Sequence, residues 1–181
     1  HRSRLLMSMA TFTLSERLTG LDFPNVALAA TDGTKVRLAN LDGTSVVYIY
    51  PRTSPPGGTA IPGWDAIPGA KGCTPQSCGF RDHFAELQAA GADAVFGLSV
   101  QDSAYQAELV ARLHLPFPIL SDEKLALQTA LDLPTFEAGG MVLLERCALV
   151  LDDGCITAVF HPITDPDGNA ADILTHLRSR T

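Results

Sequence analysis

The chain has 181 residues, of which 46% are hydrophobic, and a formal net charge of −7 at pH 7. This length suits one domain around a single packed core. The acidic balance excludes nucleic acid and anionic membrane surfaces as partners, because both require clustered Lys and Arg. No apolar run in the sequence reaches the roughly 18 to 20 residues that span a bilayer. We therefore expect small molecules or proteins as partners.

The first residues, HRSRLLMSMATF, contain neither the apolar core nor the cleavage site of a signal peptide. We expect residues 1–12 to be disordered or vector-derived, and residues 13–181 to form the single domain of a monomeric, cytoplasmic protein. In a reducing compartment the four cysteines are expected to be catalytic, metal-binding or inert, and not a structural disulfide framework.

The N-terminal part predicts a β-hairpin, because VALAATDGTKVRLANL alternates apolar and polar residues around a two-residue turn at Asp32-Gly33. A buried strand, SVVYIY, follows at 45–50 and ends at Pro51. Residues 52–72 are rich in proline and glycine and show no periodicity. Loops of this length are uncommon and often functional.

The rest of the chain alternates helical and strand patterns. Apolar residues recur at helical spacing from Pro75 to Gly91. A strand (AVFGLSV), a helix (SAYQAELVARLH), a strand (PFPILS) and a helix (EKLALQTAL) follow. VLLERCALVLDDGCITAVFHP predicts a strand, an Asp153-Gly154 turn and a returning strand, and NAADILTHLRSR predicts a closing helix. This order predicts an α/β, thioredoxin-like fold with a central mixed sheet, flanking helices and an N-terminal β-hairpin.

Two cysteines lie five positions apart in GAKGCTPQSCGFRD, where the loop runs into a helix. The helix start favours an anion at Cys73, but it supplies only about 0.3 to 2 kcal/mol. Lowering a thiol pKa from about 8.5 to about 6 takes about 3.4 kcal/mol. A second cation is therefore needed, and Arg146, where the later strand begins, is the candidate. Arg81 lies two turns along the helix and is expected to pair with Asp82 or Glu86.

The spacing also restricts disulfide chemistry. Residues five apart in an intact α-helix have Cα atoms about 8.6 Å apart, whereas a disulfide requires less than about 7 Å. Bonding Cys73 to Cys78 would unwind the first turns of the helix. Pro75 leaves a second arrangement open, in which Thr74 is the N-cap and Cys73 lies just outside the helix. Either arrangement favours a cycle in which one thiolate is oxidised and the second thiol captures it after local unfolding.

The stretches YIYP and GCTPQSCGFRD resemble the peroxiredoxins, specifically the peroxiredoxin Q or bacterioferritin-comigratory-protein group. The likeness extends over roughly residues 25–160, through LPFPILSDEKLAL to ERCALVLDDGCI. It implies a thioredoxin-dependent peroxidase of atypical two-cysteine type, acting on hydrogen peroxide and small organic hydroperoxides without a cofactor or metal. Cys73 would attack the peroxide, Cys78 would resolve the sulfenic acid as an intramolecular disulfide, and Arg146 would hold the thiolate and the peroxide oxygens.

One departure concerns peroxide binding. The group has the motif Pro-x-x-x-Thr/Ser-x-x-Cys, in which the Thr or Ser hydroxyl donates a hydrogen bond to the peroxide. With Cys73 as the cysteine of this motif, Ala66 stands at the proline position and Ala70 at the Thr/Ser position. We expect Pro51 to retain the proline role and a hydroxyl of the 52–72 loop to replace the missing one. The candidate substrate-binding residues are Pro51, Thr53, Ser54 and Gly72.

Other residues are expected to be structural. Cys147 and Cys155 are predicted to be inert, with Cys155 opposite Asp152 across the turn. Trp64 is expected to anchor the 52–72 loop. Four histidines show no metal-ligand spacing and are expected to be solvated or in the core: His83, His114, His161 and His176.

Two other functions stay open. A thioredoxin-type protein disulfide oxidoreductase is disfavoured by the C-x4-C spacing and by the absence of a proline directly before CALVL. A redox-sensing module without significant turnover is motivated by the missing threonine.

Overall fold

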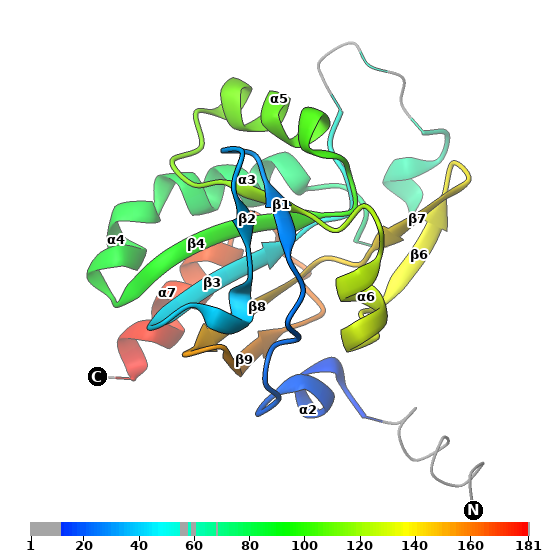
Figure 1. Ribbon diagram of the computed structural model, residues 1–181. Coiled ribbons are helices and arrows are strands. Elements are labelled where there is room, and N and C mark those ends of the chain that lie inside the picture. Colours follow the sequence, from blue (N-terminus) through cyan, green and yellow to red (C-terminus); the bar gives the residue numbers. More distant parts are fainter. Residues whose placement is uncertain (1–11, 55–57, 59–60, 68, 181) are drawn as a thin grey trace, which may run out of the picture.

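The computed structural model describes residues 12–54, 58, 61–67 and 69–180. Its main feature is a seven-stranded sheet in the order β2-β1-β5-β4-β3-β8-β9, beside a separate β6-β7 hairpin (Figure 1). β3, β4 and β5 are parallel, whereas β1 and β8 run antiparallel to their neighbours, so the predicted mixed sheet is confirmed. The strands are β1 (Leu28–Ala30), β2 (Lys35–Val36), β3 (Thr44–Ile49), β4 (Ala92–Ser99), β5 (Ile119–Ser121), β6 (Thr135–Ala138), β7 (Met141–Leu144), β8 (Cys147–Asp152) and β9 (Cys155–Phe160).

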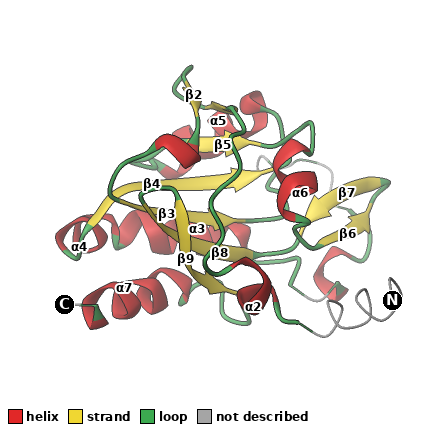
Figure 2. Ribbon diagram, turned by 60° about the horizontal axis from the view of Figure 1, so that its bottom comes forward, coloured by secondary structure: helices red, strands yellow, loops and turns green. Residues whose placement is uncertain are grey.

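Helices cover both faces of this sheet, as a thioredoxin-like fold requires (Figure 2). One hydrophobic cluster joins the sheet to α3, α4, α5 and α7, and a second joins its other face to α2 and α6. None of the described helices is long and apolar enough to cross a membrane. The helices are α2 (Leu14–Leu18), α3 (Cys73–Asp82), α4 (Phe84–Ala89), α5 (Ser103–Leu113), α6 (Ala126–Leu131) and α7 (Asn169–Ser179), with short 3-10 turns η1 (Leu38–Asn40) and η2 (Trp64–Ala66).

The central strand β3 decides which side chains meet α3. Because side chains alternate along a strand, Val47 and Ile49 enter the cluster with α2 and α6. Tyr48 and Tyr50 enter the opposite cluster, beside α3. The ring of Tyr48 stacks on Phe80 of α3, with centroids 4.4 Å apart and planes 7° from parallel. This stacking fixes α3 against the end of β3.

The N-terminal β-hairpin is present, but its turn differs from the prediction. Leu28 lies opposite Val36, and the N–H of Ala30 donates to the carbonyl of Thr34 at 2.8 Å. Three residues, and not two, therefore form the loop. The Asp32 carboxylate accepts from the Thr34 N–H at 3.0 Å and so stabilises the longer turn.

The turn at Asp153-Gly154 has the predicted two residues, because Asp152 lies directly opposite Cys155. Both turn residues have positive φ, 48° and 78°, as this tight turn requires. A third hairpin was not predicted: β6 and β7 pair around Gly139 and Gly140. The VLL run therefore belongs to β7 and is not continuous with the strand CALVL.

The first helix after the loop begins two residues earlier than Pro75 and ends earlier than Gly91. α3 starts at Cys73 with Gly72 as N-cap, so the alternative with Thr74 as N-cap is wrong. Gly72 has φ of 111°, a conformation that side chains disfavour, and a Cβ there would lie 2.6 Å from Pro166 Cγ. The helix breaks at His83, where φ −97° and ψ 7° leave the helical region, and α4 begins at the next residue.

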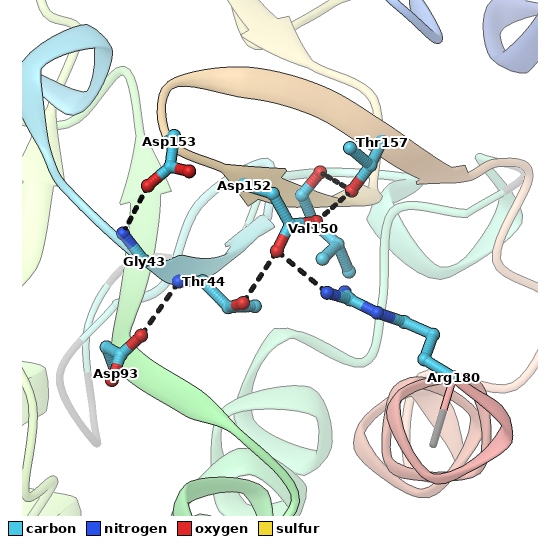
Figure 3. A network of polar contacts seen from close by, with 8 residues as sticks. All are labelled: Gly43, Thr44, Asp93, Val150, Asp152, Asp153, Thr157 and Arg180. Carbon is cyan, nitrogen blue, oxygen red and sulfur yellow. Dashed lines mark hydrogen bonds and ion pairs between the residues drawn. The ribbon is translucent and has the colours of Figure 1, made fainter.

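A polar network links Arg180, directly after α7, to Thr44 of β3, Asp152 of β8 and Thr157 of β9 (Figure 3). Asp152 Oδ1 accepts from Thr44 Oγ1 at 2.6 Å and from Arg180 Nη2 at 2.8 Å, while Oδ2 accepts from Thr157 Oγ1. Partial burial raises the pKa of Asp152, but these bonds outweigh it and hold that pKa below its ordinary value. The ionised carboxylate therefore stabilises the fold.

Asp152→Asn should lower the free energy of unfolding by about 1 to 2 kcal/mol at pH 7, because a charged acceptor is lost. A depressed folded-state pKa contributes stability above the unfolded-state pKa of about 3.9, and this stability is lost as pH falls. Urea unfolding at several pH values should therefore show the difference between variant and parent shrinking below about pH 4. The exposed Glu123→Gln is the control and should change stability by less than about 0.5 kcal/mol. A difference independent of pH would contradict the prediction.

Gly72→Ala should destabilise the protein through two effects. The strained φ should cost about 1 to 2 kcal/mol, and the contact with Pro166 should add about 1 to 3 kcal/mol. Gly33→Ala is the matched control, because its φ is 89° but no atom lies within 4 Å of the added Cβ. Denaturant unfolding should show a larger loss for Gly72→Ala, and equal losses would argue against the contact.

Candidate active site

Cys73 is the first residue of α3 and is only 5% exposed. No side chain caps this helix start, so its free N–H groups and the positive end of the helix dipole lie beside the sulfur. The Sγ atom lies 3.7 Å from the carbonyl oxygen of Ala70, which can accept from the thiol. The fold thus places the thiol in a buried, electropositive position.

Arg146 supplies the second positive charge that the sequence analysis required. Its Nη2 atom lies 3.2 Å from Cys73 Sγ. The same nitrogen also donates to three carbonyl oxygens of the turn before α3, those of Gly69 at 3.3 Å, Ala70 at 3.0 Å and Lys71 at 3.1 Å. One guanidinium thus contacts both the sulfur and the backbone that leads into it.

The strand register brings Arg146 to this position. β8 lies beside β3 with Cys147 opposite Ile49. The residue before Cys147 therefore lies at the carboxyl end of β3, where α3 begins. Because β8 runs antiparallel to β3, the start of β8, and not the end of a parallel neighbour, lies beside the end of β3.

Two residues that the sequence analysis missed complete the setting. Gln76 Oε1 accepts from Arg146 Nη1 at 2.6 Å, and Gln76 Nε2 donates to Asn169 Oδ1 at 3.0 Å. Both amide side chains are buried. Gln76 had a signal, because it lies three residues after Cys73 and therefore on the same face of α3. Asn169 had none, since only the packing of α7 brings it near.

The charge of Arg146 is buried without a carboxylate. Its side chain is 3% exposed, and no ion pair between described residues includes it. An uncompensated buried charge costs several kcal/mol. Cys73 Sγ, 3.2 Å from Nη2, is a partner of this guanidinium that can carry a full negative charge.

Two buried tyrosines lie on the same side of β3 as Cys73. The Tyr48 hydroxyl pairs with Ser77 Oγ at 3.0 Å. Burial raises the pKa of both Tyr48 and Tyr50 above the ordinary value, and the neighbouring Cys73 adds to the effect. Both phenols therefore stay protonated near neutral pH. The Tyr48 hydroxyl donates to Ser77, whereas the Tyr50 hydroxyl has no hydrogen-bond partner among the described residues.

A cavity of about 680 Å³ lies against the site, and Gly72 and Arg146 form part of its wall. Glu145 and His161 line it too, with His161 Nε2 3.2 Å from Glu145 Oε1. Phe136 contributes an apolar group to the lining, whereas Lys71, Asp165 and Asp167 contribute charged ones. The cavity can admit a small molecule to the guanidinium of Arg146.

The candidate hydroxyls of the loop lie elsewhere. Thr53 and Ser54 line a second cavity of about 450 Å³, which shares no lining residue with the first. The Thr53 backbone pairs with the side chain of Gln101, through N–H to Oε1 at 2.9 Å and Nε2 to the carbonyl at 2.7 Å. Pro51 is buried directly after β3. Among the described residues, no hydrogen bond joins Thr53 or Ser54 to Cys73.

The second thiol lies on the same regular helix. Cys78 is half-buried within α3, so its Cα lies about 8.6 Å from that of Cys73 by helix geometry. That separation exceeds the limit of about 7 Å for a disulfide, and bonding requires α3 to unwind locally. Arg81 pairs with Asp82 at 2.9 Å, as expected, and donates to the carbonyl of Leu113.

The remaining cysteines lie on the β8-β9 hairpin, and Cys147, directly after Arg146, packs in the cluster on the face of the sheet opposite Cys73. Burial raises the pKa of Cys147 to about 12, so this thiol stays protonated. Cys155 lies opposite Asp152, as predicted. The described residues include no group of three or more His, Cys, Asp or Glu that could hold a metal ion.

The described part of the 52–72 loop packs on the β6-β7 hairpin. The ring centroids of Trp64 and Phe136 lie 6.1 Å apart. Ile61 lies close to Gly139, at the tip of the hairpin. The predicted anchoring role of Trp64 agrees with this packing.

The comparisons with known proteins point in one direction. The Redoxin family matches residues 18–175. The chain is 32% identical over 158 residues to the chloroplastic peroxiredoxin Q of Oryza sativa subsp. japonica, an alignment that covers 86% of this chain and 64% of the rice protein. It is 33% identical over 103 residues to peroxiredoxin bcp1 of Schizosaccharomyces pombe, covering 56% of this chain and 45% of the yeast protein. The chain thus spans less than two thirds of the length of these relatives.

A solved structure shares the fold. The crystal structure of peroxidoxin BcpB from Mycobacterium tuberculosis superposes with a TM-score of 0.72 at 24% identity, covering 91% of this chain and 98% of that one. The family match, the named relatives and this shared fold agree with the residues quoted above. The chain belongs to the Redoxin family, and its sequence is similar to proteins named peroxiredoxin Q and peroxiredoxin bcp1.

Proposed function

We propose that this chain is a thiol-dependent peroxidase that reduces hydrogen peroxide and small organic hydroperoxides, with Cys73 as the attacking sulfur. The contact of 3.2 Å between Arg146 Nη2 and Cys73 Sγ, at the first residue of α3, carries the proposal. A buried guanidinium and a helix start both favour the thiolate, which is the nucleophilic form.

In the proposed first step, the Cys73 thiolate attacks the terminal oxygen of the peroxide and the O–O bond breaks. The departing oxygen takes the electron pair and a proton from water, while the sulfur becomes a sulfenic acid. Arg146 Nε is buried and forms no hydrogen bond with a described residue. It is therefore free to donate to a peroxide oxygen, where negative charge develops.

In the second step, Cys78 attacks the sulfenic acid, water leaves, and a disulfide between Cys73 and Cys78 forms. The first turn of α3 must open for this bond. That turn has no side-chain cap, which makes it easier to unwind. A thioredoxin-type dithiol then supplies the two electrons that restore both thiols.

The names of the relatives support the peroxide substrate and the thiol reductant, since both are called peroxiredoxins. We keep the absence of a cofactor, the monomeric state and the cytoplasmic location as expectations from the sequence. A redox-sensing module remains the second candidate, because Ala70 stands where the group has a hydroxyl. A sensor would oxidise once per signal, without sustained turnover.

Thioredoxin-coupled peroxide consumption should vanish in Cys73→Ser. In Cys78→Ser the first oxidation should persist, so that about one equivalent of peroxide is consumed per chain before turnover stalls. Trapping with dimedone should then label Cys73 as a sulfenic acid. The matched control is Cys147→Ser, a buried thiol outside the site, which should retain turnover. Undiminished turnover in Cys73→Ser would end the proposal, and a single oxidation without turnover in the parent protein would favour the sensor.

Arg146→Lys should slow the reaction with peroxide by about 10²- to 10³-fold, because the charge remains but the fork of donors to the sulfur and the peroxide is lost. Stopped-flow measurement of Cys73 oxidation would test this. Arg81→Lys is the control, because Arg81 lies on α3 with Cys73 but is paired with Asp82. This variant should react with peroxide within about twofold of the rate of the parent protein. Equal rates for both variants would contradict a role of Arg146 in peroxide activation.

A further inference from the structure

The site lacks a donor where its group has one. Ala70 replaces the hydroxyl residue, and its own carbonyl accepts from Arg146 Nη2 at 3.0 Å. Thr53 and Ser54 line a different cavity. If the proposed function holds, another donor should face the peroxide.

Unpaired buried donors reveal where that group is. Only three buried side-chain nitrogen or oxygen atoms of the described residues have no hydrogen-bond partner: Tyr50 Oη, Gln106 Oε1 and Arg146 Nε. The first and the last are donors that belong to residues beside Cys73. Leaving a donor buried and unpaired costs about 1 to 3 kcal/mol, so such atoms require an explanation. Two unpaired donors at one thiol indicate a missing acceptor, such as the oxygens of a peroxide.

The strand register places these two donors together. β3 and β8 are antiparallel, with Ile49 opposite Cys147. If this register is extended by one residue, forward from Ile49 and backward from Cys147, Tyr50 lies opposite Arg146. Side chains at such positions have Cβ atoms about 4.5 to 5.5 Å apart on one face of the sheet. The Tyr50 N–H donates to the carbonyl of Leu98 at 3.1 Å, which holds the residue in line with the sheet. Tyr50 and Cys73 also share one buried cluster.

The phenol is suited to donate. Burial raises the pKa of Tyr50, and Cys73 raises it further, so the hydroxyl keeps its proton. The nearby Ser99 hydroxyl partly offsets this, but it forms no hydrogen bond of normal geometry with Tyr50. Ser99 Oγ already accepts from Gln106 Nε2 at 2.9 Å. The Tyr50 proton therefore remains available for a ligand.

We propose that the Tyr50 hydroxyl donates a hydrogen bond to an oxygen of the peroxide bound between Cys73 and Arg146, in place of the hydroxyl missing at position 70. Tyr50 keeps its proton throughout: the thiolate is oxidised to sulfenic acid, the peroxide is reduced to water or an alcohol, and the proton for the leaving oxygen comes from water. This proposal rests on the proposed function and adds a catalytic residue to it.

Tyr50→Phe should lower the second-order rate constant of Cys73 with hydrogen peroxide by about 10- to 100-fold. The rate should be divided by the thiolate fraction, measured by ultraviolet absorbance, so that loss of a peroxide contact is separated from a change in thiol ionisation. Phe keeps the ring and its packing, so the variant should fold. Tyr48→Phe is the matched control on the same strand and face, because its hydroxyl is paired with Ser77. It should react within about twofold of the parent protein.

Three results would overturn the assignment: a Tyr50→Phe rate per thiolate within twofold of the parent, an equal loss in Tyr48→Phe, or a loss explained wholly by a smaller thiolate fraction. The proposed function fails separately. If Cys73 in the parent protein reacts with peroxide no faster than a free cysteine, both proposals fall, whereas fast parent oxidation with an unaffected Tyr50→Phe removes only the role of Tyr50.

Discussion

The burial of one guanidinium without a carboxylate shapes the candidate site. The two terminal nitrogens of Arg146 contact Gln76, three carbonyls of the turn before α3 and the sulfur of Cys73, whereas Nε has no partner among the described residues. Carbonyls and an amide offer partial negative charge only, so these hydrogen bonds do not neutralise the guanidinium. The thiol is the group that can supply a full negative charge. In the proposed function, the thiolate of Cys73 compensates the charge of the buried guanidinium.

Backbone geometry gives this contact its precision. Arg146 precedes β8 and Tyr50 follows β3, and these two strands pair over six residues of each. The start of α3 is fixed separately, by the stacking of Phe80 on Tyr48 and by Gly72, which has a left-handed backbone conformation and packs closely on Pro166. Sulfur, guanidinium and phenol thus come from three rigid elements. Such placement limits the reorganisation needed when a charged transition state forms.

The sequence predicted the parts of this arrangement that have local signals. Apolar runs identified the central strands, and the glycine-rich entry to a helix identified Cys73. The start of the CALVL strand and the family resemblance pointed to Arg146. The β6-β7 hairpin had a signal in Gly139-Gly140 but was missed, because VLL reads as continuous with CALVL across Glu145-Arg146. Gln76 had a signal in its spacing of three residues from Cys73 but was missed. Asn169 and Tyr50 could not be placed from sequence, since their positions depend on how α7 and β3 pack around α3.

The same contact explains how oxidation can prepare the resolving step. In the reduced state a thiolate at Cys73 and the carbonyls of 69–71 share Arg146, which holds the turn before α3 closed. Oxidation to a sulfenic acid removes the negative charge, so the attraction between sulfur and guanidinium weakens as the first chemical step ends. Cys78 can bond to Cys73 only when the first turn of α3 opens. In the proposed cycle, the first turn of α3 is therefore held most strongly in the thiolate state, before peroxide binds. It is held less strongly in the sulfenic-acid state, when Cys78 must reach Cys73.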